Sequence, residues 1–107
     1  MSVPGLTITA TPIGNLDDLS PRAIASFKSA DLIACEDTRH TGLMLSRLGI
    51  PYGQLVSYHD HTSAKAREGL LKALAEGKAI TLVSDAGTPL ISDPGYRLVK
   101  ACRDRDI

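Results

Sequence analysis

The sequence predicts an α/β fold, a three-layer domain with a mainly parallel sheet and helices on both faces. Short apolar runs alternate with helical patterns four times along the 107 residues. These runs are apolar at successive positions, which is typical of strands that are covered on both faces of a parallel sheet. The links from helix to strand are short, whereas the links from strand to helix are long and polar, as in a sheet whose crossovers are helices.

The amino-acid composition is that of a globular domain. Hydrophobic residues make up 43% and charged residues 22%, as in an ordinary globular domain. Twelve basic residues balance twelve acidic ones, so no overall charge indicates a nucleic-acid or membrane surface. No segment is apolar for long enough to cross a membrane and no secretory signal is visible, so we expect a cytoplasmic protein. Cys35 and Cys102 lie in apolar patterns and are predicted to be buried thiols outside any disulfide.

The first two strand–helix units occupy the first half of the chain. Leu6–Ala10 is β-rich and is predicted to be the first strand. Ser20 is placed to cap the first helix, with Pro21 in the first turn, where its missing N–H is harmless. Asp31–Cys35 is the second strand. A second helix is expected at Gly42–Leu48, because apolar residues recur there and a glycine follows.

The third unit contains the clearest helix of the sequence. Leu55–Tyr58 is a weaker strand, and Ser63–Glu76 carries apolar residues at helical spacing and ends at a glycine. Within this helix, Glu68 lies four residues before Lys72. That spacing predicts a favourable ion pair on the helix surface.

The fourth unit holds the most unusual stretch of the chain. The strand Ala79–Val83 is followed by Ser84–Gly95, in which two glycines, two prolines, two aspartates, two serines and a threonine occupy twelve positions. Such residues prevent regular structure, and a long loop in a compact domain usually has a function. Asp93 is expected to cap the last helix, which begins at Pro94. We therefore expect this loop to hold a ligand.

The polar residues gather in the links that follow the strands. In a parallel sheet, all these links lie at one edge, where open α/β folds bind their ligands. The first link carries a single glycine and is neither a dinucleotide-binding nor a Walker loop, which disfavours a dinucleotide or triphosphate. The residues that we expect around this crevice are Pro12, Gly14, Asn15, Glu36, Asp37, Arg39, His40, His59, Asp60 and His61.

Several interpretations of the middle links stay open. His59 and His61 alternate along an extended segment and, with Glu36 or Asp37, have the donor set of a two-histidine, one-carboxylate metal site. The commoner explanation is that they are loop residues that cap and orient their neighbours. Asp37 is as well placed to cap the next helix as to act in a site. Asp85, with the two histidines, would also fit a metal-dependent phosphohydrolase.

Three blocks of the sequence resemble the signature blocks of a known family. They read ATPIGNL at residues 10–16, EDTRHT at residues 36–41 and SDAGTPLISDPG at residues 84–95. In order and spacing they are similar to the tetrapyrrole (corrin/porphyrin) methylase superfamily, in its ribosomal RNA small subunit methyltransferase I branch. The resemblance implies that residues 1–107 are an N-terminal domain. Family members continue into a second α/β domain, which is absent from this chain.

The resemblance also implies an activity. It is S-adenosylmethionine-dependent methylation of the 2′-hydroxyl of a cytidine ribose in the decoding region of small-subunit (16S) ribosomal RNA, by a homodimer and without a metal. Two alternatives stay open. One is a non-catalytic assembly or dimerisation domain, and the other is a methylase of the same superfamily that acts on a tetrapyrrole or another small molecule.

Carried over by position, the resemblance assigns cofactor contacts to the first-strand proline and to the loop after the fourth strand. These positions are Pro12, Gly14, Ser84, Asp85, Ala86, Gly87 and Thr88. The loop has Ser-Asp-Ala-Gly where the superfamily more commonly has Gly-Asp-Pro, so the resemblance assigns the location of the loop but not the individual atoms that contact the cofactor. A ribose hydroxyl needs a general base or a polarising partner, and the candidates are Asp37, His59 and Asp93.

Overall fold

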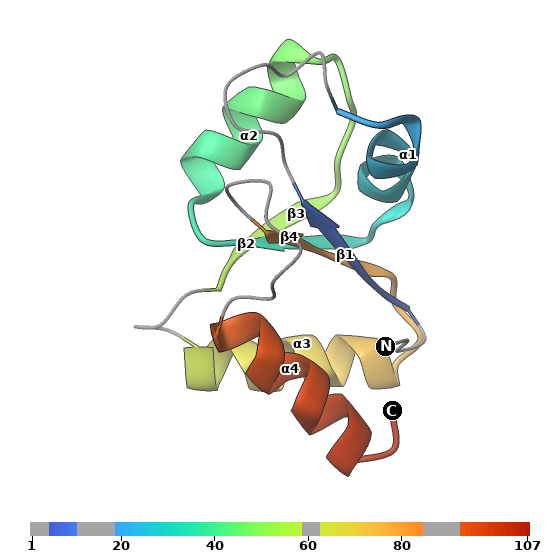
Figure 1. Ribbon diagram of the computed structural model, residues 1–107, viewed down its shortest axis with the longest axis vertical. Coiled ribbons are helices and arrows are strands. Elements are labelled where there is room, and N and C mark those ends of the chain that lie inside the picture. The colour runs from blue at the N-terminus through green and yellow to red at the C-terminus, as the bar shows by residue number, and fades with distance from the viewer. Residues whose placement is uncertain (1–4, 11–18, 59–62, 85–92) are drawn as a thin grey trace.

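The computed structural model describes residues 5–10, 19–58, 63–84 and 93–107, in which four strands alternate with four helices (Figure 1). The predicted α/β class is confirmed. The elements are β1 (Leu6–Ala10), α1 (Pro21–Ser29), β2 (Leu32–Cys35), α2 (Thr38–Arg47), β3 (Gln54–Ser57), α3 (Ser63–Ala75), β4 (Ile80–Ser84) and α4 (Asp93–Asp104).

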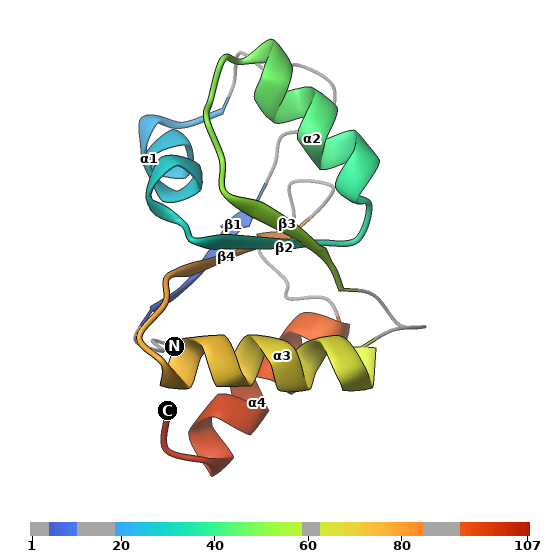
Figure 2. The same ribbon diagram turned by 180° about the vertical axis from the view of Figure 1, so that it is seen from behind.

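The four strands form one parallel sheet in the order β1-β4-β2-β3. Helices α1 and α2 lie on one face of it, and α3 and α4 lie on the other, as both views show (Figures 1 and 2). β1 and β3 are the outer strands. The three-layer arrangement follows from strands that are apolar on both faces, because each face then needs its own cover.

Each face of the sheet has its own core. Phe27, Ile33 and Leu45 are fully buried between the sheet and the α1–α2 layer. Leu70, Ile80 and Leu98 are fully buried between the sheet and the α3–α4 layer. Cys35 and Cys102 belong to opposite cores, are buried, and form no disulfide, as predicted.

Helix α2 begins at Thr38, four residues before the predicted start at Gly42. The reason is the cap: Asp37 Oδ1 accepts the backbone N–H of Arg39 at 3.0 Å and that of His40 at 3.2 Å, which satisfies two donors of the first turn. Gly42 therefore lies inside the helix. A Cβ atom there would be 3.3 Å from Leu55 Cδ1, so the glycine lets α2 lie close to β3.

The predicted ion pair within α3 is wrong. Glu68 does not pair with Lys72; it forms a two-point ion pair with Arg105, just beyond α4, with N–O distances of 2.7 and 3.0 Å. A guanidinium matches both carboxylate oxygens, whereas an ammonium offers one point charge. The other predicted boundaries differ from the observed ones by at most one residue; α4, for example, begins at Asp93 and not at Pro94.

Candidate active site at the carboxyl edge of the sheet

The carboxyl ends of the strands lie level with one another along one edge of the sheet. Ala10 at the end of β1 is paired in register with Ser84 at the end of β4, and Cys35 is paired with Ser57. From Ala10 the chain leads to α1 on one face, and from Ser84 it leads to α4 on the opposite face. In open α/β sheets, ligands bind outside the strand ends at the point where successive connections leave for opposite faces, so this is where we expect a ligand.

The structure places only part of the predicted site. Ser84 is the last residue of β4, and Asp93 is the first residue of α4. Both therefore flank the loop that the sequence singled out. The predicted residues that lie outside the described part of the chain are Pro12, Gly14, Asn15, His59, Asp60, His61, Asp85, Ala86, Gly87 and Thr88. Their roles stay predictions.

Asp37 has a structural role that is visible in its contacts. It follows β2, and its carboxylate receives two N–H groups of the α2 N-terminus. Of the two interpretations of this residue, capping is confirmed. The cap also fixes the carboxylate at the carboxyl edge of the sheet, where a ligand of the crevice would meet it.

A cluster of one tyrosine and two arginines was not predicted from the sequence. Tyr58 directly follows β3 and is 2% exposed. Burial raises the pKa of its hydroxyl above the ordinary value, while a hydrogen bond from Arg67, the charge of Arg67 and the charge of Arg97 act in the opposite direction. Arg67 lies on α3 and Arg97 on α4, so the cluster joins the ends of three elements at the carboxyl edge.

Arg67 has a buried guanidinium nitrogen that no described residue satisfies. Its Nη1 atom is buried and has no hydrogen-bond partner among residues 5–10, 19–58, 63–84 and 93–107. A buried guanidinium nitrogen without an acceptor is costly, and it suits a carboxylate or phosphate ligand. The signal in the sequence was faint: an arginine in the second turn of a helix is usually solvated, and only the position of Tyr58 after an apolar strand hinted at burial.

The described residues give no support to a metal site or to a membrane segment. Within them, no three His, Cys, Asp or Glu side chains lie close enough together to hold a metal ion. The predicted two-histidine ligand set includes His59 and His61, which are not among these residues, so it is not tested. No helix in the described part of the chain is long and apolar enough to cross a membrane.

Comparison with known proteins gives relatives at high identity. The chain is 55% identical over 102 residues to "Ribosomal RNA small subunit methyltransferase I" of Escherichia coli O157:H7, a match that covers 95% of this chain and 35% of that protein. It is 53% identical to the protein of the same name from Synechocystis sp., over 95% of this chain and 36% of the relative. The chain thus spans about a third of the length of the curated relatives that it matches.

A solved structure shows the same fold. The methyltransferase CobJ superposes with a TM-score of 0.65 over 95% of this chain and 42% of the CobJ chain, at 17% sequence identity. The sequence also matches the family described as tetrapyrrole (corrin/porphyrin) methylases over residues 5–107, nearly its full length. Together with the parallel sheet, this match over nearly the full length shows that the chain belongs to the tetrapyrrole (corrin/porphyrin) methylase family.

Proposed function

We propose that this chain is the N-terminal, cofactor-binding part of an S-adenosylmethionine-dependent methyltransferase that acts on small-subunit ribosomal RNA. The observation that carries the proposal is the in-register pairing of Ala10 with Ser84. Two signature blocks that are far apart in the sequence begin at these residues, so they start side by side at the carboxyl edge. The names of the relatives supply the substrate class.

The residues at this edge suit S-adenosylmethionine. Pro12, Gly14 and the run Ser84–Thr88 would hold it, since small residues let backbone N–H and C=O groups approach adenine and ribose closely. Arg67, whose buried Nη1 atom has no acceptor in the described part of the chain, suits the methionyl carboxylate. When bound, the cofactor supplies an electrophilic methyl group on a sulfonium centre.

The chain's own part in the reaction is to position the two reactants and to take up a proton. Methyl transfer is an in-line displacement, so holding the ribose 2′-hydroxyl of a cytidine in the decoding region against the crevice supplies much of the rate. Asp37, His59 and Asp93 are the candidates for the group that accepts the hydroxyl proton. Asp37 is the one whose carboxylate is held in place by described hydrogen bonds.

The rest of the enzyme would complete the site. The relatives are about three times as long as this chain, and we assign to their remaining part the other wall of the cofactor cleft. We further propose a homodimer that works on ribosomal RNA in the cytoplasm. On this view the isolated chain binds S-adenosylmethionine weakly and transfers no methyl group.

A chimera tests the proposal. This chain replaces the matching N-terminal third of the Escherichia coli O157:H7 relative, and transfer of a labelled methyl group to small ribosomal subunits is measured. We expect transfer, and we expect Gly87→Val to abolish cofactor binding in calorimetry, because the added side chain would block the close backbone approach. A correctly folded chimera that binds no S-adenosylmethionine would refute the proposal.

The role of Asp37 can be separated from its cap. Asn caps helices about as well as Asp but is no base, so Asp37→Asn keeps α2 intact and removes the carboxylate. If Asp37 accepts the proton, this variant keeps its melting temperature and loses about a hundredfold or more in turnover. An Asp37→Asn chimera with unchanged turnover assigns the base to His59 or Asp93, whose substitutions follow in the same assay.

A further inference from the structure

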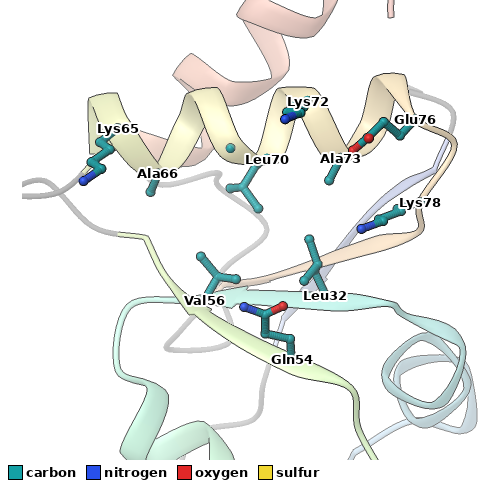
Figure 3. Close-up of a pocket in the computed structure, with 11 residues that line it drawn as sticks. Leu32, Gln54, Val56, Lys65, Ala66, Leu70, Lys72, Ala73, Glu76 and Lys78 are labelled. Atoms are coloured by element: carbon teal, nitrogen blue, oxygen red, sulfur yellow. The ribbon is translucent and has the colours of Figure 1, made fainter.

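A groove separates α3 from the strands β2 and β3 (Figure 3). Its volume is about 570 Å³. In Figure 3, Ala66, Leu70 and Ala73 point from α3 toward Val56 on β3 and Leu32 on β2. Leu32, Val56 and Ala66 stay partly exposed although they pack against the core, so the floor of the groove is apolar and open to solvent.

Basic side chains dominate the rim of this groove. Lys65, Lys72 and Lys78 are exposed there, and Glu76 is the acidic side chain on the same rim. Glu68 is engaged with Arg105, so it does not neutralise Lys72. No ion pair of the three lysines occurs among the described residues. The rim therefore carries a local positive charge on a chain whose total charge is zero.

The groove also borders an open sheet edge. β3 is an outer strand, and its side chains Gln54 and Val56 line the groove. The backbone groups on its outer side are positioned to pair with one more extended segment. In such pairing the main chain gives affinity, and alternate side chains enter the neighbouring pocket.

We propose that this groove, the α3–β3 groove, binds an acidic, amphipathic, extended segment of a partner protein. Apolar side chains of the segment would cover Leu32 and Val56, its carboxylates would meet Lys65 and Lys72, and its backbone would pair with β3. The inference does not rest on the proposed methyl transfer, because it uses none of the residues proposed to bind the cofactor or to accept the proton.

The charges on the rim decide between this occupant and two others. A second copy of this chain docking through the same groove would bring two sets of lysines together, and charged side chains beside an open edge normally prevent such pairing. Single-stranded RNA would meet the lysines, but none of the described residues that line the groove is aromatic, so its bases would have nothing there to stack on and the apolar floor would stay uncovered. An acidic amphipathic segment satisfies both the rim and the floor.

Two substitutions test the proposal without disturbing the core. Lys72→Glu reverses one rim charge. Gly69→Leu fills the groove from α3: a Cβ atom at Gly69 meets nothing within 4 Å, so the larger side chain has room and the helix gains a better helix former. Lys28→Glu is the matched control, because Lys28 is an exposed lysine at the end of α1 on the other face of the sheet.

The probe is a labelled synthetic peptide of about ten residues with the repeat Val-Thr-Glu-Thr, so that in an extended strand valine and glutamate take turns on the face toward the groove and threonine lies on the other face. We expect it to bind the 107-residue chain, with amide shifts in NMR spectra at Gln54–Ser57 and along α3. Lys72→Glu and Gly69→Leu should each weaken binding about tenfold or more, while Lys28→Glu should leave it unchanged. A peptide with lysine in place of glutamate should not bind.

Three results would overturn the proposal. The first is an acidic peptide that does not bind the wild-type chain, or that binds the Gly69→Leu and Lys72→Glu variants equally well. The second is an RNA oligonucleotide whose binding is lost in Lys72→Glu and kept in Gly69→Leu, which would assign the lysines to phosphates. The third is self-association in sedimentation that both groove variants abolish, which would assign the groove to a second copy.

Discussion

Asp31 and Ala79 exchange two hydrogen bonds across the amino edge of the sheet. The backbone N–H of Asp31 donates to the carbonyl of Ala79, and Asp31 Oδ2 accepts the backbone N–H of Ala79, both at 2.8 Å. The carbonyl of Asp31 also accepts the N–H of Gln54 at 3.3 Å. One residue thus aligns the starts of β2, β4 and β3, which sets the level of their carboxyl ends as well.

Removal of this side chain should loosen the amino edge. We expect Asp31→Ala to lower the free energy of unfolding by about 1 kcal/mol, because the N–H of Ala79 loses a charged acceptor at an exposed site. Asp31→Asn should cost less, since its amide oxygen still accepts. Urea denaturation of the three proteins measures both changes. Equal losses in the two variants would mean that the charge of Asp31, and not the hydrogen bond, stabilises the edge.

The sequence predicted the strands and helices better than it predicted the contacts at the candidate site. Periodicity, glycines and caps located each strand and helix because they are local signals. The order β1-β4-β2-β3 was not predicted, since strand neighbours depend on contacts between distant residues. The pairing of Glu68 with Arg105 was missed for the same reason. The local spacing predicted an ion pair with Lys72, but Glu68 pairs with Arg105, which lies 37 positions away in the sequence. The Tyr58–Arg67 contact was missed because burial of an arginine has no local signature.

The segment just after α4 contains an aspartate, Asp106, at a position whose backbone angle favours glycine. Asp106 has φ of 57°, the left-handed position that glycine occupies after α2 and α3, where Gly49 and Gly77 have φ of 66° and 86°. Its N–H donates to Arg103 and the next N–H donates to Cys102, the pattern of a Schellman end. Asp106→Gly should therefore raise the free energy of unfolding by about 0.5 kcal/mol.

The reverse substitution, of a glycine by a residue with a Cβ atom, can be made after α2. A Cβ atom at Gly49 meets nothing within 4 Å, so Gly49→Ala tests the backbone angle alone and should lower the free energy of unfolding by about 1 kcal/mol. Thermal melts followed by circular dichroism measure the pair. An Asp106→Gly variant that melts below the wild type would show that the aspartate side chain stabilises this helix end.

Acid should weaken the link between α3 and the segment after α4. The hydrogen bond from Arg105 is the main cause that holds the pKa of Glu68 below its ordinary value. A folded-state pKa that is lowered stabilises the fold above the unfolded pKa of about 4.3, and this stabilisation is lost as the pH falls through the lower folded value. Glu68→Gln should therefore be less stable than the wild type near neutral pH and approach it in acid.

Lys72→Gln is the control for this acid dependence. Because Lys72 is not the partner of Glu68, its substitution should leave the pH dependence of the melting temperature unchanged between neutral pH and acid. A Lys72→Gln variant that behaves like Glu68→Gln would restore the ion pair within α3 that the sequence suggested and would contradict the observed pairing.

Alkali should act on the tyrosine at the carboxyl edge. Burial raises the pKa of Tyr58, and burial also raises the pKa of the Cys102 thiol. A folded-state pKa that is raised stabilises the fold fully below the unfolded value, about 10 for tyrosine, and this stabilisation is lost as the pH rises toward the folded value. The wild type should therefore lose stability above about pH 10, because tyrosine ionises there in the unfolded chain while the buried hydroxyl of Tyr58 stays protonated.

Tyr58→Phe should flatten this alkaline loss, because phenylalanine does not ionise. Arg67→Met in the protein that keeps Tyr58 should make the alkaline loss of stability steeper. The hydrogen bond and charge of Arg67 lower the pKa of Tyr58, so their removal raises this pKa further. The melting temperature across the alkaline range measures both effects. The Cys102→Ala variant shows how much of the alkaline loss of stability comes from ionisation of the Cys102 thiol. If Tyr58→Phe and the wild type lose stability in parallel, the hydroxyl is solvated in the folded chain and burial does not raise its pKa.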